Sequence, residues 1–435
     1  MADRQPVPCI IDTDPGVDDV LAILLALSSP HLLVLAITVT HGNCTLDAAT
    51  ANLKKVFFAL EKHLHERPDE VSRFPNVDVA WRKKRGAGPI EVYIGSAGPI
   101  EGEPVTAKYF HGRDGLGDAT FRHPDLNPPA NHVFTLCNIS TASATEGVTA
   151  LLSQHPPSTI AYVALGPVTS LAHLHQSAAA SGASPLSAFS AIFSMGGAVN
   201  HPGNTTPVAE FNYYADPFAA QLLFALSLPH LCIFPLDLTS YLALPFSDYQ
   251  TFVDPTFSDT KSPSKPEGKS PLVHFTSSFL ERTREVMASY GSDAMEQHDP
   301  TVIYALMAWA RARSMDDAVG LSGDEEELAP GWRFKRVDFE VETIGAITRG
   351  MLVQDLRYSS RLTRSQPAST NRVQAQDALD LEEVEAHRAE GEQTRAEAVK
   401  AHERRSGANV VVSSPGSEAL TRDLLRSIWG GGVAL

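Results

Sequence analysis

The chain has 435 residues, 43% of them hydrophobic, and a formal net charge of −16 at pH 7. The length allows a large α/β domain with an appendage, and the negative charge argues against a general binder of nucleic acids or anionic membranes. The four cysteines form no C-x-x-C pair, which is typical of reduced thiols. The first residues lack a signal-peptide core, and no apolar stretch reaches about 18 residues. We therefore expect a cytoplasmic protein without a membrane span.

Apolar runs alternate with helical patterns from the N-terminus to about Asp355. This alternation predicts an α/β fold with an open, mostly parallel central sheet and helices on both faces. The predicted strands are Val7–Ile11, Leu32–Thr40, Glu91–Ile94, Thr159–Leu165, Ala191–Met195, His230–Phe234 and Arg333–Val341. The predicted helices are Val20–Leu27, Asp47–Leu60, Ala142–Ser153, Pro167–His175, Asp216–Leu226, Phe275–Ser289 and Thr301–Ala310.

Three segments interrupt this pattern and are predicted to be insertions, near residues 63–88, 255–271 and 314–330. The first holds the basic patch Arg82-Lys83-Lys84-Arg85, for which a role in nuclear import or phosphate binding is the alternative to a solvated loop. The second is rich in Ser, Pro and Lys, and the third holds the acidic run Asp324-Glu325-Glu326-Glu327. We expect all three to be solvent-exposed loops.

The character of the sequence changes after the last predicted strand, so we predict a main domain over residues 1–358 and a linker with a helical C-terminal extension over residues 359–435. Within the extension, Asp377–Arg405 is predicted as an exposed helix and residues 406–416 as a loop. One apolar helical stripe follows, and we expect it to dock on the main domain. The stripe consists of Leu420, Leu424, Leu425 and Ile428.

Four aspartates lie within eight residues in Asp12-Thr13-Asp14-Pro15-Gly16-Val17-Asp18-Asp19, on a predicted strand-to-helix turn. Open α/β sheets bind ligands at this edge. Like charges 4 Å apart repel by about 4 kcal/mol at an effective dielectric constant of 20, so a fold that gathers them usually supplies a cation. Ligands with only oxygen donors favour Ca²⁺ or Mg²⁺. Helix capping is the simpler alternative, and the spacing does not fit an EF-hand.

Three further polar clusters follow predicted strands or precede predicted helices. Thr40-His41-Gly42-Asn43 ends the second strand, and the segment 203–212 carries amides and a carboxylate suited to several hydroxyl groups. His298-Asp299-Pro300 precedes a helical run. Taken singly, the segment 203–212 could be an Asn-rich turn and the last cluster a helix cap.

Together these motifs resemble those of the inosine-uridine nucleoside hydrolases, the calcium-dependent nucleoside N-ribohydrolases. The segment Asp12–Asp19 is similar almost letter for letter to the family's opening motif, and the resemblance spans about residues 7–355. The other motifs follow in the family's order: Gly42-Asn43, Leu165-Gly166-Pro167, Met195-Gly196-Gly197, Asn204, Ala209-Glu210-Phe211-Asn212, His298-Asp299-Pro300, Val341-Glu342-Thr343 and Thr348-Arg349-Gly350.

The resemblance implies hydrolysis of the N-glycosidic bond of ribonucleosides to free base and ribose. It implies Ca²⁺ as the cofactor, bound by Asp14, Asp19, Asp299 and the main-chain carbonyl of Leu165, where the family usually has Thr. It also implies that Asp14 is the general base for the attacking water, and that His298 protonates the departing base. We expect the neighbouring Asp299 to orient His298. The residues implied to hold ribose hydroxyls are Asp18, Asn43, Asn204, Glu210 and Asn212.

Further expectations follow from the same resemblance. Asp12 is expected to support the ligands from behind, and the glycine-rich segment His111–Gly117 resembles the loop that closes over the substrate. The implied partner is a small ribonucleoside, with no nucleic acid or membrane, and the implied assembly is a homo-oligomer, a dimer or a tetramer. The stretches 241–249 and 279–296, where the base pocket should draw its residues, carry no readable motif.

The residue types agree with this chemistry. Breaking an N-glycosidic bond develops positive charge on the ribose, which a carboxylate-rich pocket stabilises. A magnesium phosphatase of the haloacid-dehalogenase type, which also places D-x-D after its first strand, is the alternative enzyme. Its phosphate would call for Lys or Arg where this chain has Asn and Glu. A non-catalytic nucleoside-binding protein is the alternative of another class.

Overall fold

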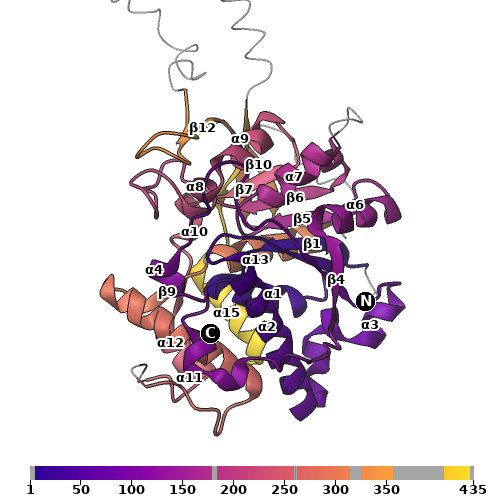
Figure 1. Ribbon diagram of the computed structural model, residues 1–435, viewed down its shortest axis with the longest axis vertical. Helices are drawn as coiled ribbons and strands as arrows, with labels where there is room; N and C mark the ends of the chain where they lie inside the picture. Colours follow the sequence, from indigo (N-terminus) through magenta and orange to yellow (C-terminus); the bar gives the residue numbers. More distant parts are fainter. Residues whose placement is uncertain are drawn as a thin grey trace, which may run out of the picture.

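The computed structural model describes residues 5–178, 184–258, 260, 262–313, 325–355 and 406–431. Its centre is a ten-stranded sheet in the order β10-β11-β14-β7-β6-β5-β1-β2-β3-β4 (Figure 1). The pairs from β14 to β4 are parallel, and β10 and β11 are antiparallel additions at one edge. The strands are β1 (Val7–Thr13), β2 (Leu32–Val39), β3 (Ile90–Ile94), β4 (Cys137–Ser143), β5 (Ala161–Ala164), β6 (Ala191–Met195), β7 (Leu231–Phe234), β10 (Glu325–Ala329), β11 (Trp332–Asp338) and β14 (Gly407–Ser413).

Helices cover both faces of this sheet, as predicted. One apolar cluster joins the sheet to α1, α2, α12, α13 and α15, and a second joins the opposite face to α6, α7 and α9 (Figure 1). Strand β1 shows why the faces differ, because Cys9 and Ile11 lie in the first cluster and Ile10 lies in the second. The helices are α1 (Val17–Leu27), α2 (Leu46–Glu66), α3 (Val79–Lys84), α4 (Lys108–His111), α5 (Ala119–Arg122), α6 (Ala144–Gln154), α7 (Thr169–Ser177), α8 (Phe211–Ala215), α9 (Pro217–Ala225), α10 (Leu236–Thr239), α11 (Phe246–Phe252), α12 (Pro271–Ser289), α13 (His298–Arg313) and α15 (Ser417–Trp429).

Two small antiparallel sheets complete the regular structure, β8 (Ala243–Pro245) with β9 (Ala294–Glu296) and β12 (Glu340–Val341) with β13 (Leu352–Val353). The sequence analysis did not predict strand β4. This strand is half-exposed at the edge of the sheet, and its residues do not form an apolar run. In the described part of the chain, no helix is both long enough and apolar enough to cross a membrane.

The C-terminal segment differs most from the prediction. The expected loop at residues 406–416 is wrong, because residues 407–413 form β14 between β11 and β7, inside the main sheet. Helix α15 then packs its apolar stripe into the same core as α1, so the expected docking is confirmed. The predicted helix over 377–405 lies outside the described residues.

Two of the three insertions are more ordered than expected, whereas the described residues from 255 to 270 contain no helix or strand. Residues 63–88 extend α2 and form short helices, and Arg82 is buried, where it donates hydrogen bonds to the carbonyls of Val34, Asn76 and Gly88. The solvated-loop prediction is therefore wrong for Arg82, whose charge is held by main-chain oxygens. Part of the acidic run belongs to β10, and the rest lies outside the described residues.

Candidate active site

The turn between β1 and α1 folds around the carboxylate of Asp19. Its Oδ1 accepts from the Thr13 hydroxyl at 2.5 Å, and its Oδ2 accepts from the Gly16 N–H at 2.9 Å and from Asn43 Nδ2 at 2.9 Å. Asp19 thereby caps the helix to which it belongs. Helix capping, the simpler alternative for the aspartate cluster, therefore applies to Asp19. It does not explain the other aspartates of the motif.

Asp14 lies beside this turn with one carboxylate oxygen bonded and one free. Its Oδ2 accepts the N–H of Asn43 at 2.6 Å, whereas Oδ1 is buried without a protein partner. A Cβ on either Gly42 or Gly166 would lie within 2.4 Å of an Asp14 oxygen, so the carboxylate fits only against glycine at both places. Burial, and next the charge of Asp19, raise the pKa of Asp14 well above its usual value.

Asp18, Asp19 and Asp299 form the tightest acidic group, with one oxygen of each within 4.8 Å of the others. All three are buried. Burial and the charge of Asp19 raise the pKa of Asp18 to about 6, and burial and the charge of Asp18 raise the pKa of Asp299 well above its usual value. With Asp14 these residues form what we call the acid floor. A floor with oxygen donors alone, one of them unpartnered, fits a hard divalent cation.

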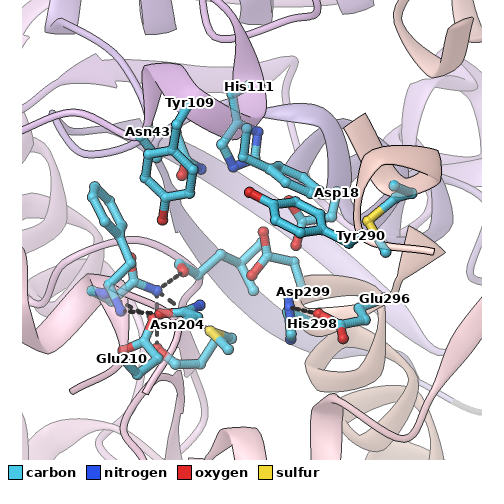
Figure 2. A pocket seen from close by; sticks show the side chains of 17 residues that line it. Asp18, Asn43, Tyr109, His111, Asn204, Glu210, Tyr290, Glu296, His298 and Asp299 are labelled. Atoms are coloured by element: carbon cyan, nitrogen blue, oxygen red, sulfur yellow. Dashed lines mark hydrogen bonds and ion pairs between the residues drawn. The ribbon is translucent and has the colours of Figure 1, made fainter. Parts of the chain in front are cut away.

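A cavity of about 290 Å³ opens above the acid floor. Figure 2 shows its walls, which come from loops at the carboxyl ends of the strands together with α4, the end of α12 and the start of α13. Eight of the predicted site residues line it, whereas Asp14 and Asp19 are not among its lining residues. The eight are Asp18, Asn43, Leu165, Asn204, Glu210, Asn212, His298 and Asp299.

The polar wall opposite the turn is built on the start of α8. Glu210 caps this helix through the N–H groups of Asn212 and Tyr213, and its Oε2 also accepts the N–H of Gly197 at 2.9 Å. Burial raises the pKa of Glu210. Asn212 donates through Nδ2 to the Leu165 carbonyl at 2.7 Å, which leaves that oxygen a second lone pair.

His298 is held at both ring nitrogens. Its Nδ1 lies 2.8 Å from Thr239 Oγ1, and its Nε2 lies 3.1 Å from Glu296 Oε2 (Figure 2). The expectation that Asp299 orients this ring is wrong, because these two residues do so. Burial alone would lower the pKa of His298, but the bond to Glu296 and the charge of Asp18 outweigh burial and raise it.

The comparisons with known proteins agree with this geometry. The family model of the inosine-uridine preferring nucleoside hydrolases matches residues 9–68 and 77–386. The chain belongs to this family. A probable uridine nucleosidase 2 of Oryza sativa is 31% identical over 300 residues, covering 68% of this chain and 73% of that protein. The pyrimidine-specific ribonucleoside hydrolase RihA of Salmonella schwarzengrund is 28% identical over 366 residues, covering 84% and 92%.

The fold is also that of a solved relative. A purine-preferring ribonucleoside hydrolase from Gardnerella vaginalis superposes with a TM-score of 0.62 at 18% identity, covering 97% of this chain and 98% of that one. The family match and the related nucleosidases show that the protein is a nucleoside hydrolase that cleaves ribonucleosides. The phosphatase and the non-catalytic alternatives have no support, and none of the described residues lining the cavity is a Lys or Arg that could hold a phosphate. The relatives differ in their named base preference.

Several lining residues of this hydrolase were not found from the sequence. Tyr109 and Phe110 come from α4, Met287 and Tyr290 from the end of α12, and Glu296 from β9. The last three lie in the stretch 279–296 where no motif was readable. The signals that could have found some of them are adjacency to the glycine-rich loop for Tyr109 and Phe110, and a place two residues before His298 for Glu296.

The structure also shows the surroundings of His111 and Asp12, for which the sequence predicted supporting roles. His111 is buried against the opening motif, where its Nδ1 accepts the N–H of Val17 at 3.2 Å, and it lines the cavity, so the segment 111–117 begins at the cavity wall. Its motion stays a prediction. Asp12 lies near the end of β1, where its Oδ1 accepts hydrogen bonds from the hydroxyls of Thr38 at 2.5 Å and Ser170 at 3.0 Å, and burial raises its pKa to about 7.

Proposed function

We propose that this hydrolase binds Ca²⁺ at the acid floor and uses Asp14 as the general base toward ribonucleosides. The observation that carries the proposal is the buried Asp14 Oδ1, which has no protein partner while its sister oxygen is fixed by Asn43. An unsatisfied buried carboxylate oxygen is costly unless a cation or water meets it. A carboxylate held in this way can take a proton from a water placed above it.

The residues that would hold the cation are Asp14, Asp19, Asp299 and the carbonyl of Leu165. Support comes from the crowding of the carboxylates and from the lone pair that Leu165 retains beside Asn212. When bound, Ca²⁺ would keep these carboxylates ionised and orient water and sugar hydroxyls. Asp18 belongs to the same tight group, so we also expect it to face the cation.

The ribose would be held by the polar walls. Asp18 and Asn43 line one side, and Asn204, Glu210 and Asn212 line the other. Three backbone N–H groups hold the Glu210 carboxylate in one orientation, so its remaining lone pairs are already positioned toward the ligand. Preorganised acceptors of this kind stabilise the positive charge that develops on the sugar.

His298 would deliver a proton to the leaving base. Its pKa is raised, so the ring stays charged nearer neutral pH, and Thr239 fixes its plane. A homo-oligomer remains a prediction, to be measured by light scattering on the eluted protein.

The direct test is release of free ribose from a panel of nucleosides. We expect ribose from at least one of inosine, uridine and cytidine, activity that falls on chelation, and recovery with Ca²⁺. Release of phosphate from phosphomonoesters without ribose release, or tight nucleoside binding without turnover, would contradict the proposal.

A further inference from the structure

A second group of metal-ligating side chains lies outside the active site. His123 follows α5, Asp125 lies in the short 3-10 helix Pro124–Leu126, and His274 lies in the first turns of α12. One ligand atom of each lies within 4.8 Å of the other two. Two imidazoles and a carboxylate at such distances form a donor set distinct from that of the acid floor.

The three side chains converge from two segments that are far apart in sequence. His274 Nε2 lies 3.0 Å from Asp125 Oδ2, and the two imidazole rings are 5.5 Å apart between centroids. Both histidines are at most 3% exposed, whereas the Asp125 side chain is half-exposed. The group is therefore enclosed on the imidazole side and reachable from solvent on the carboxylate side.

A further carboxylate supports this group. Glu281 Oε2 lies 3.4 Å from His123 Nε2 and 2.9 Å from Arg122, which leaves His123 Nδ1 as the ring nitrogen available for coordination. A carboxylate on the far nitrogen of a ligating histidine is the usual outer-shell arrangement in metal sites. His274 Nδ1 is buried without a hydrogen-bond partner, so hydrogen bonds within the protein satisfy only one of the two ring nitrogens.

We propose that His123, Asp125 and His274 bind a zinc-class divalent cation. Two nitrogens and one oxygen suit Zn²⁺ or a similar transition metal and do not suit Ca²⁺, which takes oxygen ligands. Water would complete the coordination on the exposed side. Small side-chain rotations would bring the three ligand atoms to about 2.0–2.2 Å from the ion.

The position of the group gives the cation a role near the active site. Residues 118–126 continue directly from the glycine-rich loop 111–117, and a Cβ on Gly117 would lie 2.9 Å from the Phe279 carbonyl of α12. The end of α12 carries Met287, and Tyr290 follows it into the cavity wall. A cation between Asp125 and His274 would therefore tie the base of the loop to the helix that forms part of the cavity wall.

The test uses full-length protein cleared of transition metals and titrated with Co²⁺ in the presence of Ca²⁺. Nitrogen-containing sites of low coordination number give Co²⁺ a much stronger visible absorption than octahedral oxygen sites. We expect one equivalent of such a spectrum, displaced by Zn²⁺. The Co²⁺ spectrum should persist in Asp19→Ala, because this variant alters only the acid floor. A failure of the zinc-site proposal can therefore be told apart from a failure of the proposed function.

The variants are Asp125→Asn and His274→Gln, and the matched control is His132→Ala. His132 bonds Glu61 at 2.6 Å as a histidine–carboxylate pair without a second imidazole. We expect the two variants to weaken Co²⁺ binding by about tenfold or more and the control to leave it unchanged. Zn²⁺ should also raise the unfolding midpoint of the wild type and the control, and not that of Asp125→Asn. Absence of the spectrum, or a spectrum that both variants retain, would overturn the proposal and leave a hydrogen-bonded network.

Discussion

The floor and the rim of the active-site cavity are built in opposite ways. The acid floor is buried, and hydrogen bonds from backbone N–H groups fix the carboxylates of Asp14 and Asp19. The rim, which we define as Tyr109, Phe110, Met287 and Tyr290, includes side chains that are largely in solvent, with Tyr109 54% and Tyr290 66% exposed. Under the proposed function, the fixed part of the site binds the cation and the sugar, and the exposed rim contacts the base.

The largest effect is expected from Asp19→Ala, which removes both the cap of the turn and a floor carboxylate. The variant should lose bound Ca²⁺ and ribose release together, because Gly16, Asn43 and Thr13 lose their shared acceptor. Metal content by elemental analysis and activity are measured on the same sample. Full calcium content in this variant would break the assignment of the floor.

Asp14→Asn tests the base itself. It keeps the volume of the side chain but cannot accept the proton of water, so kcat should fall by ~10²–10⁴-fold. The matched control is Asp47→Asn at an exposed position in the first turn of α2, and this variant should stay within experimental error of the wild type. If Asp14→Asn keeps its kcat, the base is another floor residue.

His298→Ala tests the link between floor and rim. We expect inosine hydrolysis to slow by ~10²-fold, because a poor leaving group loses its proton donor, and a nitrophenyl riboside to slow far less. Circular dichroism checks the fold. Equal losses on both substrates would show that His298 only organises the start of α13.

The smallest of these mutational effects is expected at the rim. Tyr290→Ala should raise KM for nucleosides by ~10-fold, because base–aromatic stacking contributes about 1–3 kcal/mol. Tyr241→Ala is the control, since Tyr241 is 71% exposed and does not line the cavity. A fall in kcat with unchanged KM would show that Tyr290 acts on the reaction step instead.

The comparison also explains what the sequence could reveal. Asp14, Asp18 and Asp19 lie within six residues of one another between the end of β1 and the start of α1. Their side chains are therefore close in space for a local reason, and the motif alone predicts it. Tyr290 reaches the cavity through the packing of α12 and belongs to no motif, so the sequence alone did not indicate it. Strand β14 was missed for the same reason, because its place between β11 and β7 depends on a return of the chain from far along the sequence.

The central claim is that the acid floor and the polar walls together bind the ribose. Comparing kcat/KM for uridine and inosine with that for their 2′-deoxy counterparts tests it most directly. A site built to bind a hydroxyl leaves buried polar groups unpaired when the hydroxyl is absent, and discrimination can reach ~10⁴–10⁵-fold, lowered here because the deoxy bond is intrinsically easier to break. The account predicts a clear preference for both ribonucleosides. Equal efficiencies would contradict it and would mean that the cavity recognises the base alone.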